Sequence, residues 1–194
     1  MSWLDSLLGR TKLQKPNMDR LFALSTAGPS LGIEAELAPD GRAAVCLRPV
    51  EGGEFAQVEQ QLRDLVRVAC DGKDFHGQVD ILQDKLGYQW IVFSDPQLEE
   101  LVSLVHVAGG ELEAQGFGEQ LLAAVFRMRH ASGAPATPVY LIYNYKRGAF
   151  YPFAPIGDRV RDNATEFRVA SSLDGTMPME KDLERWFALW DCPL

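Results

Sequence analysis

The stretch VYLIYNYKRGAFYPFAP, residues 139–155, decides how this chain folds. Aromatic and β-branched side chains flank Lys146, Arg147 and Gly148, a composition typical of two strands joined by a turn. Gly148 can adopt the positive φ that a tight turn requires. Pro152 has no N–H to donate to a ladder, which predicts that the returning strand lies at an edge of the sheet. The stretch therefore predicts an aromatic hairpin with Lys146 and Arg147 at its tip.

The segments before this hairpin predict more strands. Residues 31–37 (LGIEAEL) alternate apolar and polar side chains, and residues 42–50 (RAAVCLRPV) follow after a Pro-Asp-Gly turn signal, so a hairpin is expected there. A second hairpin is expected from residues 78–83 (QVDILQ) and 88–93 (YQWIVF), which flank a Lys-Leu-Gly turn signal. Residues 121–129 (LLAAVFRMR) predict one further strand.

Apolar spacings of three and four residues predict helices between these strands. The first is expected to begin with Asn17 as its cap and to end before Gly28-Pro29, and the second occupies residues 54–69. The longest is expected to open at Asp95-Pro96 and to end at Gly116 in a left-handed cap. The last is a terminal helix carrying an apolar stripe of Leu183, Trp186, Phe187 and Trp190. Hairpins joined through helices predict an α+β fold, an antiparallel sheet with helices packed on it.

Composition limits the classes of function. The formal net charge of -8 argues against a general nucleic-acid binder, because such proteins neutralise phosphates with lysine and arginine. No apolar run approaches the roughly 20 residues that span a bilayer, and the first residues lack the pattern of a secretory signal. A cytoplasmic location is therefore expected.

No group of residues has the spacing of a catalytic, cofactor or metal site. The three cysteines are scattered and favour reduced, buried thiols, as expected of Cys46 within an apolar run. The histidines have no ligand spacing, and His106 within an apolar helix is expected to be structural. We therefore expect a protein that is not an enzyme and that holds no metal or cofactor.

The first residues form a separate segment. Trp3, Leu4, Leu7 and Leu8 make a short amphipathic stripe, and residues 1–16 carry three cations against one acid in an otherwise acidic chain. A helix this short needs a surface to dock on, which can be its own domain, a partner protein or the anionic face of a membrane. The expected organisation is an amphipathic segment over residues 1–16 and one α+β domain over residues 17–194.

Several motifs carry a resemblance to a known family. GEFAQV, LLAAVFRM, RDNATEFRV, ERWFALW and above all YKRGAFYPFAP resemble the phage-shock-protein-A-associated protein B family, PspAB, of actinobacteria and archaea. The similarity runs over nearly the whole chain and includes the opening SWLDSLLGR. It implies a role in an envelope-stress response whose central component, phage shock protein A (PspA), is a membrane-bound coiled-coil protein. Separately, the order of elements is similar to the secretion-chaperone-like (YbjN-like) fold.

The sequence is compatible with three functions. The leading hypothesis is a non-enzymatic accessory protein that binds PspA or one of its associated proteins, with at most peripheral membrane contact. The alternatives are a small enzyme or binding module that holds an anionic ligand with Lys146 and Arg147, and a chaperone-like module that binds a peptide against its sheet. The expected contact residues are Lys146, Arg147 and Tyr151 of the hairpin, with Trp3, Leu4, Leu7 and Leu8 of the first segment. The sequence leaves a homodimer open.

Overall fold

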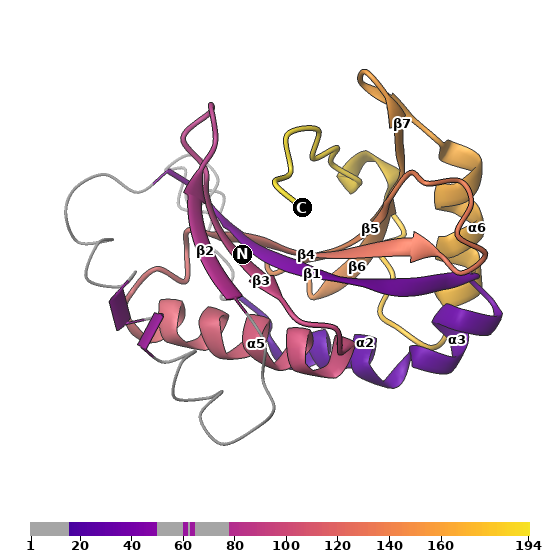
Figure 1. Ribbon diagram of the computed structural model, residues 1–194. Coiled ribbons are helices and arrows are strands. Elements are labelled where there is room, and N and C mark those ends of the chain that lie inside the picture. Colours follow the sequence, from indigo (N-terminus) through magenta and orange to yellow (C-terminus); the bar gives the residue numbers. More distant parts are fainter. Residues whose placement is uncertain (1–15, 50–59, 62, 65–77) are drawn as a thin grey trace, which may run out of the picture.

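A six-stranded antiparallel sheet with the order β2-β3-β1-β4-β5-β6 forms the centre of the molecule (Figure 1). The computed structural model describes residues 16–49, 60, 61, 63, 64 and 78–194. The strands are β1 Leu37–Leu47, β2 Gln78–Gln83, β3 Gln89–Ser94, β4 Leu121–His130, β5 Val139–Asn144 and β6 Ala149–Phe153. A separate two-stranded ribbon, β7 Pro155–Gly157 and β8 Val160–Arg161, follows β6. The α+β class and the antiparallel sheet are as the sequence predicts.

Both faces of the sheet are buried, which explains the nearly continuous apolar runs of its central strands. In β1, Val45 and Leu47 belong to the larger core on the helical side, whereas Ala44 and Cys46 belong to a second core on the opposite side. The same alternation continues through β3, β4 and β5. We call the side that bears Cys46 the open face, because none of the long helices in the described residues covers it (Figure 1).

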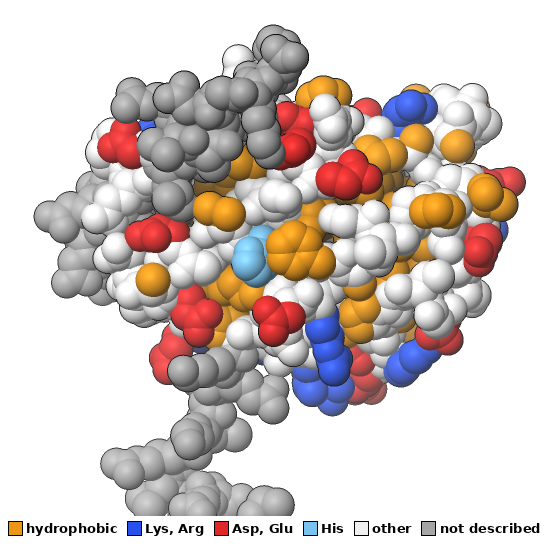
Figure 2. Space-filling model, turned by 90° about the horizontal axis from the view of Figure 1, so that it is seen from below, with side chains coloured by type: hydrophobic (Ala, Val, Ile, Leu, Met, Phe, Trp, Pro, Cys, Tyr) orange, Lys and Arg blue, Asp and Glu red, His pale blue; other side chains and the backbone are white. Residues whose placement is uncertain are grey.

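Short helices and one long helix cover the other face. They are η1 Asp19–Phe22, α2 Ala23–Thr26, α3 Gly28–Ile33 and α5 Leu98–Ala114. Gly109 of α5 lies against Met18 and Tyr145, and an added Cβ would meet the Met18 sulfur at 3.0 Å, so this glycine allows close packing. His106 packs its ring on Phe22 with centroids 4.6 Å apart, in agreement with a structural role. Figure 2 shows this side, where acidic and basic side chains lie around hydrophobic ones.

The last third of the chain returns to the sheet. Helix α6, Asn163–Leu173, is capped by the Asp162 carboxylate, which accepts from the Thr165 N–H at 3.0 Å. Helix α6 is not among the predicted elements, although Asp162 before it is a common helix-start signal. After the short η2 turn, Leu183–Arg185, residues 186–194 run across the open face without regular secondary structure. The predicted terminal helix is therefore wrong.

The first predicted hairpin is also wrong. Pro29 does not end a helix but occupies the first turn of α3, where a missing N–H costs nothing, so residues up to Ile33 are helical. The expected turn at Gly41 is a bulge inside one long strand, β1. Gly41 has φ +67°, and its carbonyl accepts from the Asp95 N–H at 3.0 Å.

Helix ends differ from the predictions in detail. Asn17 does not cap a helix; its carbonyl accepts from the Tyr143 hydroxyl at 2.6 Å, and the helical residues begin two positions later. Asp95 does not cap α5 directly, since Gln97 is the N-cap, but its carboxylate accepts from the Gln97 N–H at 2.7 Å. Gly116 ends α5 with φ +89°, as predicted. Of the helix expected over residues 54–69, the four described residues are helical, and the others lie outside the described part.

The aromatic hairpin and the hairpin of β2 and β3 are confirmed. β5 pairs with β6 around the turn 145–148, with Gly148 at φ +63°, and β6 is an edge strand, as Pro152 indicates. β2 pairs with β3 around Gly87, which has φ +87°.

Candidate functional site

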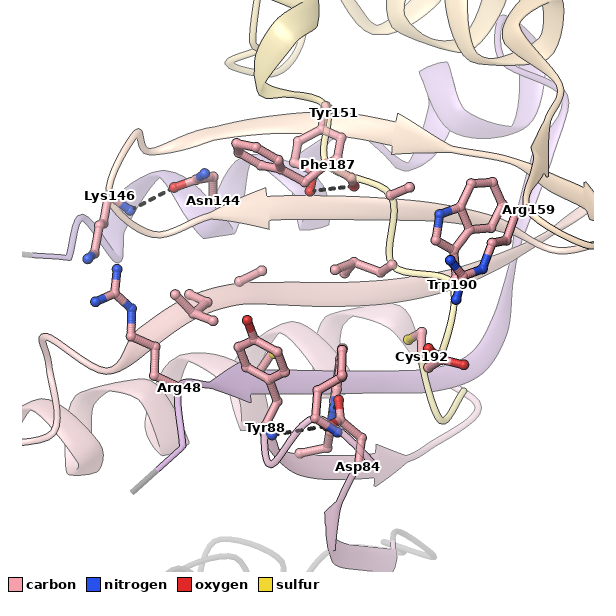
Figure 3. A pocket seen from close by; sticks show the side chains of 18 residues that line it. Arg48, Asp84, Tyr88, Asn144, Lys146, Tyr151, Arg159, Phe187, Trp190 and Cys192 are labelled. Atoms are coloured by element: carbon pink, nitrogen blue, oxygen red, sulfur yellow. Dashed lines mark hydrogen bonds between the residues drawn. The ribbon is translucent and has the colours of Figure 1, made fainter. Parts of the chain in front are cut away.

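A pocket of about 510 Å³ lies on the open face of the sheet (Figure 3). Its floor comes from strands β1, β3, β4, β5 and β6, and one wall comes from residues 187–192 of the last segment. Arg159, between β7 and β8, also lines the pocket. The turn between β2 and β3 supplies another wall. Most of the lining is apolar, and five aromatic side chains take part: Tyr88, Trp90, Tyr151, Phe187 and Trp190.

Side chains from the domain hold the last segment by its carbonyl oxygens. Four hydrogen bonds do this: Arg161 Nη1 to Trp186 O at 2.8 Å, Tyr151 Oη to Phe187 O at 3.1 Å, Arg42 Nη2 to Pro193 O at 3.0 Å and Tyr140 Oη to Leu194 O at 3.1 Å. Trp186 and Leu194 are buried, and Trp190 meets the Phe153 ring edge to face at 5.0 Å. The pocket wall is therefore fixed by packing and by main-chain recognition rather than by a β-ladder.

Asp84 organises the wall formed by the β2–β3 turn. Its Oδ1 accepts from the backbone N–H groups of Leu86 at 2.9 Å and Tyr88 at 3.0 Å, which closes the turn. Its Oδ2 accepts from the indole Nε1 of Trp90 at 2.9 Å, which fixes that ring in the pocket. The carboxylate is thus engaged on both oxygens.

One end of the pocket is positively charged. Arg48, just after β1, and Lys146, in the β5–β6 turn, point toward one another there (Figure 3). Neither forms an ion pair with an acidic residue in the part of the chain that the structure describes. Loss of hydration lowers the pKa of Lys146, the charge of Arg48 lowers it further, and Glu119 acts in the opposite direction.

The β5–β6 turn separates two cations that are neighbours in sequence. Asn144 Oδ1 accepts from the backbone N–H groups of Lys146 at 3.1 Å and Arg147 at 3.3 Å, which holds the turn. Lys146 is half-buried and lines the pocket, whereas Arg147 is exposed and does not line it. The sequence predicts that both residues lie at the tip but does not distinguish their surroundings.

Asn17 packs against the same turn. Its N–H donates to the Tyr145 carbonyl at 2.9 Å, and a Cβ at Gly148 would lie 3.2 Å from the Asn17 side chain, a tight contact, so glycine is favoured there mainly for its φ of +63°. Residues 1–15, which include Trp3, Leu4, Leu7 and Leu8, lie outside the described residues. They are joined to the domain beside the turn that carries Lys146 and Arg147.

Of the predicted contact residues in the hairpin, Lys146 and Tyr151 are brought together in one pocket. Tyr151 is buried, and its hydroxyl is used to hold the last segment. Sequence reasoning missed Arg48 and Asp84. Arg48 stands 98 positions before Lys146, so only the strand order β1-β4-β5 brings the two together.

Burial holds two thiols and one phenol of the pocket in their neutral forms. Burial raises the pKa of Cys46 to about 12 and that of Cys192 to about 12. Burial also raises the pKa of Tyr151, against the influence of Arg161. Among the described residues, no three His, Cys, Asp or Glu side chains gather as a metal site would require. The arrangement suits noncovalent binding of an apolar group that carries negative charge.

Comparison with protein families identifies the chain. The family described as PspAB, PspA associated protein B, matches residues 1–194. The chain belongs to the PspAB family. The name of the family indicates association with PspA, which agrees with an accessory role in the phage-shock response.

Comparisons with curated proteins and with solved structures give no match to this PspAB protein. The secretion-chaperone-like architecture therefore stays a prediction. Within the described ranges, no helix has the length and apolar character needed to cross a membrane.

Proposed function

We propose that this PspAB protein is a non-enzymatic accessory of the envelope-stress response that binds a protein partner, either PspA or a protein associated with it. The observation that carries the proposal is the position of the β5–β6 turn. This turn presents the exposed Arg147 beside Asn17, from which residues 1–15 extend, so the two segments expected to contact a partner start from one place. The family match over the whole chain supports the choice of partner.

The chemistry of the pocket supports binding over catalysis. With pKa values of about 12, Cys46 and Cys192 are thiols at neutral pH, and a thiol is a far weaker nucleophile than a thiolate. Asp84 uses both carboxylate oxygens within its own turn and with Trp90. None of these groups is poised as a general base or nucleophile.

The charge of the turn indicates the kind of surface that binds there. The protein carries a formal net charge of -8, whereas the β5–β6 turn presents the exposed cation Arg147 outside the pocket. Opposite charges across an interface speed encounter and select the partner. We therefore infer that an acidic stretch of the partner docks at this turn on the cytoplasmic side of the membrane, with residues 1–15 adding apolar contact.

A binding titration with purified PspA tests this proposal. Arg147→Glu should weaken binding at least about tenfold, since a cation facing an acidic partner is replaced by a like charge. Arg129→Glu is the matched control, because Arg129 is exposed at the opposite end of β4 and should leave the affinity unchanged. Both variants should unfold within about 0.5 kcal/mol of the wild type, as surface changes usually do.

Deletion of residues 1–15 is the second arm of this test. The truncated chain keeps Asn17 and its contacts with Tyr143 and Tyr145, so its Tm should stay close to that of the full chain while its affinity for PspA falls. A wild-type protein that does not bind PspA, or an Arg147→Glu variant that binds as well as Arg129→Glu, would refute the proposal. Unfolding of the truncated chain would assign the segment to the core instead.

A further inference from the structure

We propose that the pocket on the open face binds a small amphipathic anion, a molecule with an apolar body and a carboxylate or phosphate group at one end. This site is distinct from the partner contact proposed for Arg147, because Arg147 does not line the pocket. The inference stands on the shape, lining and charge of the cavity and does not depend on the identity of the protein partner.

The apolar body is recognised by the floor and walls. A volume of about 510 Å³ falls within the range of roughly 300–1,000 Å³ that is typical of small-ligand sites. Trp90 and Trp190 supply large flat surfaces, and Leu122, Ala123 and Leu189 complete the apolar lining. Both indoles are held in place, Trp90 by Asp84 and Trp190 by the Phe153 ring, so little ordering is needed when a ligand enters.

The anionic group is recognised by Arg48 and Lys146. Arg48 and Lys146 form no ion pair with a described acidic residue, and their repulsion is offset only in part by Glu119, so a bound anion removes the remainder. The guanidinium of Arg48 offers two parallel N–H donors that match a carboxylate or phosphate, while Lys146 supplies a compact charge. Burial and the charge of Arg48 lower the pKa of Lys146 by more than Glu119 raises it, in agreement with a cation that is only partly compensated.

The acidic residues that line the pocket do not neutralise this end. Asp84 is engaged on both oxygens by the β2–β3 turn and by Trp90. Asp191 is exposed and adjoins Trp190 and Cys192, which lie at the far end from Lys146 in Figure 3. Arg159 also lines the far end beside Trp190 (Figure 3), so that end carries both signs of charge, whereas the end at Arg48 and Lys146 carries two cations. A ligand is therefore oriented with its anion at Arg48 and Lys146 and its apolar body toward Trp190.

A set of three probes separates the two parts of this recognition. Anilinonaphthalene sulfonate carries an apolar ring system and one anion, phenylnaphthylamine carries similar rings without the anion, and inorganic phosphate is an anion without the rings. The folded wild-type protein should bind the sulfonate at least about tenfold more tightly than phenylnaphthylamine, since a charge-assisted contact contributes this much or more. Phosphate alone should not compete at millimolar concentration. Binding is followed by probe emission and by quenching of tryptophan fluorescence.

Three single-cation variants locate the anion. Lys146→Met and Arg48→Met keep much of the apolar stem and remove one charge each, so both should weaken sulfonate binding about tenfold and leave phenylnaphthylamine binding unchanged. Arg147→Met removes the same charge from the neighbouring position and should leave both affinities unchanged. Near-UV circular dichroism of each variant shows that the probes report on folded protein.

Competition identifies the source of a natural ligand. Displacement of the sulfonate by free laurate indicates a soluble amphipathic anion, whereas Lys146-dependent retention of the protein on phosphatidylglycerol vesicles indicates a lipid headgroup with part of its chain. Either result supports the proposal. Three results would overturn it. The first is equal affinity for the sulfonate and phenylnaphthylamine, and the second is an equal effect of Lys146→Met and Arg147→Met on sulfonate binding. The third is displacement of the sulfonate by PspA but not by laurate or vesicles.

Discussion

Replacement of Glu166 should release the last segment from the sheet. This carboxylate is only 2% exposed, accepts from the Ala154 N–H at 2.8 Å, and pairs with Arg161 through Nε at 3.0 Å and Nη2 at 2.9 Å. Arg161 in turn donates to the Trp186 carbonyl at 2.8 Å and lies 5.2 Å above the Phe153 ring. One buried acid therefore positions the guanidinium that anchors the pocket wall.

The structure allows an estimate of how much a replacement of Glu166 lowers the free energy of unfolding. Breaking a buried ion pair from one side costs about 3–5 kcal/mol, because the remaining charge stays buried without a partner. The side chain of Arg161 is 23% exposed, so water compensates part of this loss and we expect about 3 kcal/mol for Glu166→Ala. Glu166→Gln keeps an acceptor for the Ala154 N–H and should cost about half as much. At about 2–4 °C per kcal/mol for a domain of this size, Glu166→Ala should lower Tm by roughly 6–12 °C.

Urea unfolding followed by tryptophan fluorescence and by far-UV circular dichroism measures these values. Lys181→Met is the matched control, since Lys181 pairs with Asp174 at the surface and exposed pairs contribute at most about 1 kcal/mol. Glu166→Ala should also weaken probe binding in the pocket, because Trp186 loses its anchor. A cost below about 1 kcal/mol, or a loss equal to that of Lys181→Met, would refute the reasoning.

Three further results are expected. Phe153→Ala should cost about 3–5 kcal/mol in urea unfolding, because the ring is fully buried, and a loss below 1 kcal/mol would contradict its place in the core. With pKa values of about 12, Cys46 and Cys192 have roughly one thiolate in ten thousand at pH 8, so a disulfide reagent should label them far more slowly in folded than in unfolded protein. Burial and the charge of Arg48 lower the pKa of Lys146, and the charged form of Lys146 is the one that binds the sulfonate. Affinity for the sulfonate should therefore be full below this pKa and fall as the pH rises through it. Lys146→Met should abolish this fall in affinity.

The sequence predicts elements whose signals are local. The aromatic hairpin, the hairpin around Gly87 and the end of α5 at Gly116 each depend on a glycine with positive φ beside a regular pattern, and all three are present. The prediction of a hairpin around Gly41 is wrong because Pro-Asp-Gly is compatible with a bulge as well as with a turn. The Asp95 N–H donates to the Gly41 carbonyl and holds the bulge, and these two residues are 54 positions apart in the sequence.

The prediction of a terminal helix is wrong for a related reason. The stripe of Trp186, Phe187 and Trp190 has helical spacing, yet the carbonyls of Trp186 and Phe187 accept from Arg161 and Tyr151 instead of from helical N–H groups. Tertiary hydrogen bonds thus replace local ones, and no local signal shows this. The site could be predicted only in part, because the difference between Lys146 and Arg147 depends on which side of the turn each side chain occupies.

This difference makes the β5–β6 turn a thermodynamic link between two surfaces. Lys146 lines the pocket and Arg147 is exposed one residue later, on a turn whose backbone is tied by Asn144 and Asn17. If a ligand at Lys146 changes the affinity of a partner at Arg147 by some factor, the partner must change the affinity of the ligand by the same factor. A short turn with a hydrogen-bonded backbone is suited to this reciprocity, since a backbone shift at one residue moves its neighbour as well. PspA binding measured with and without the sulfonate probe gives the coupling free energy directly.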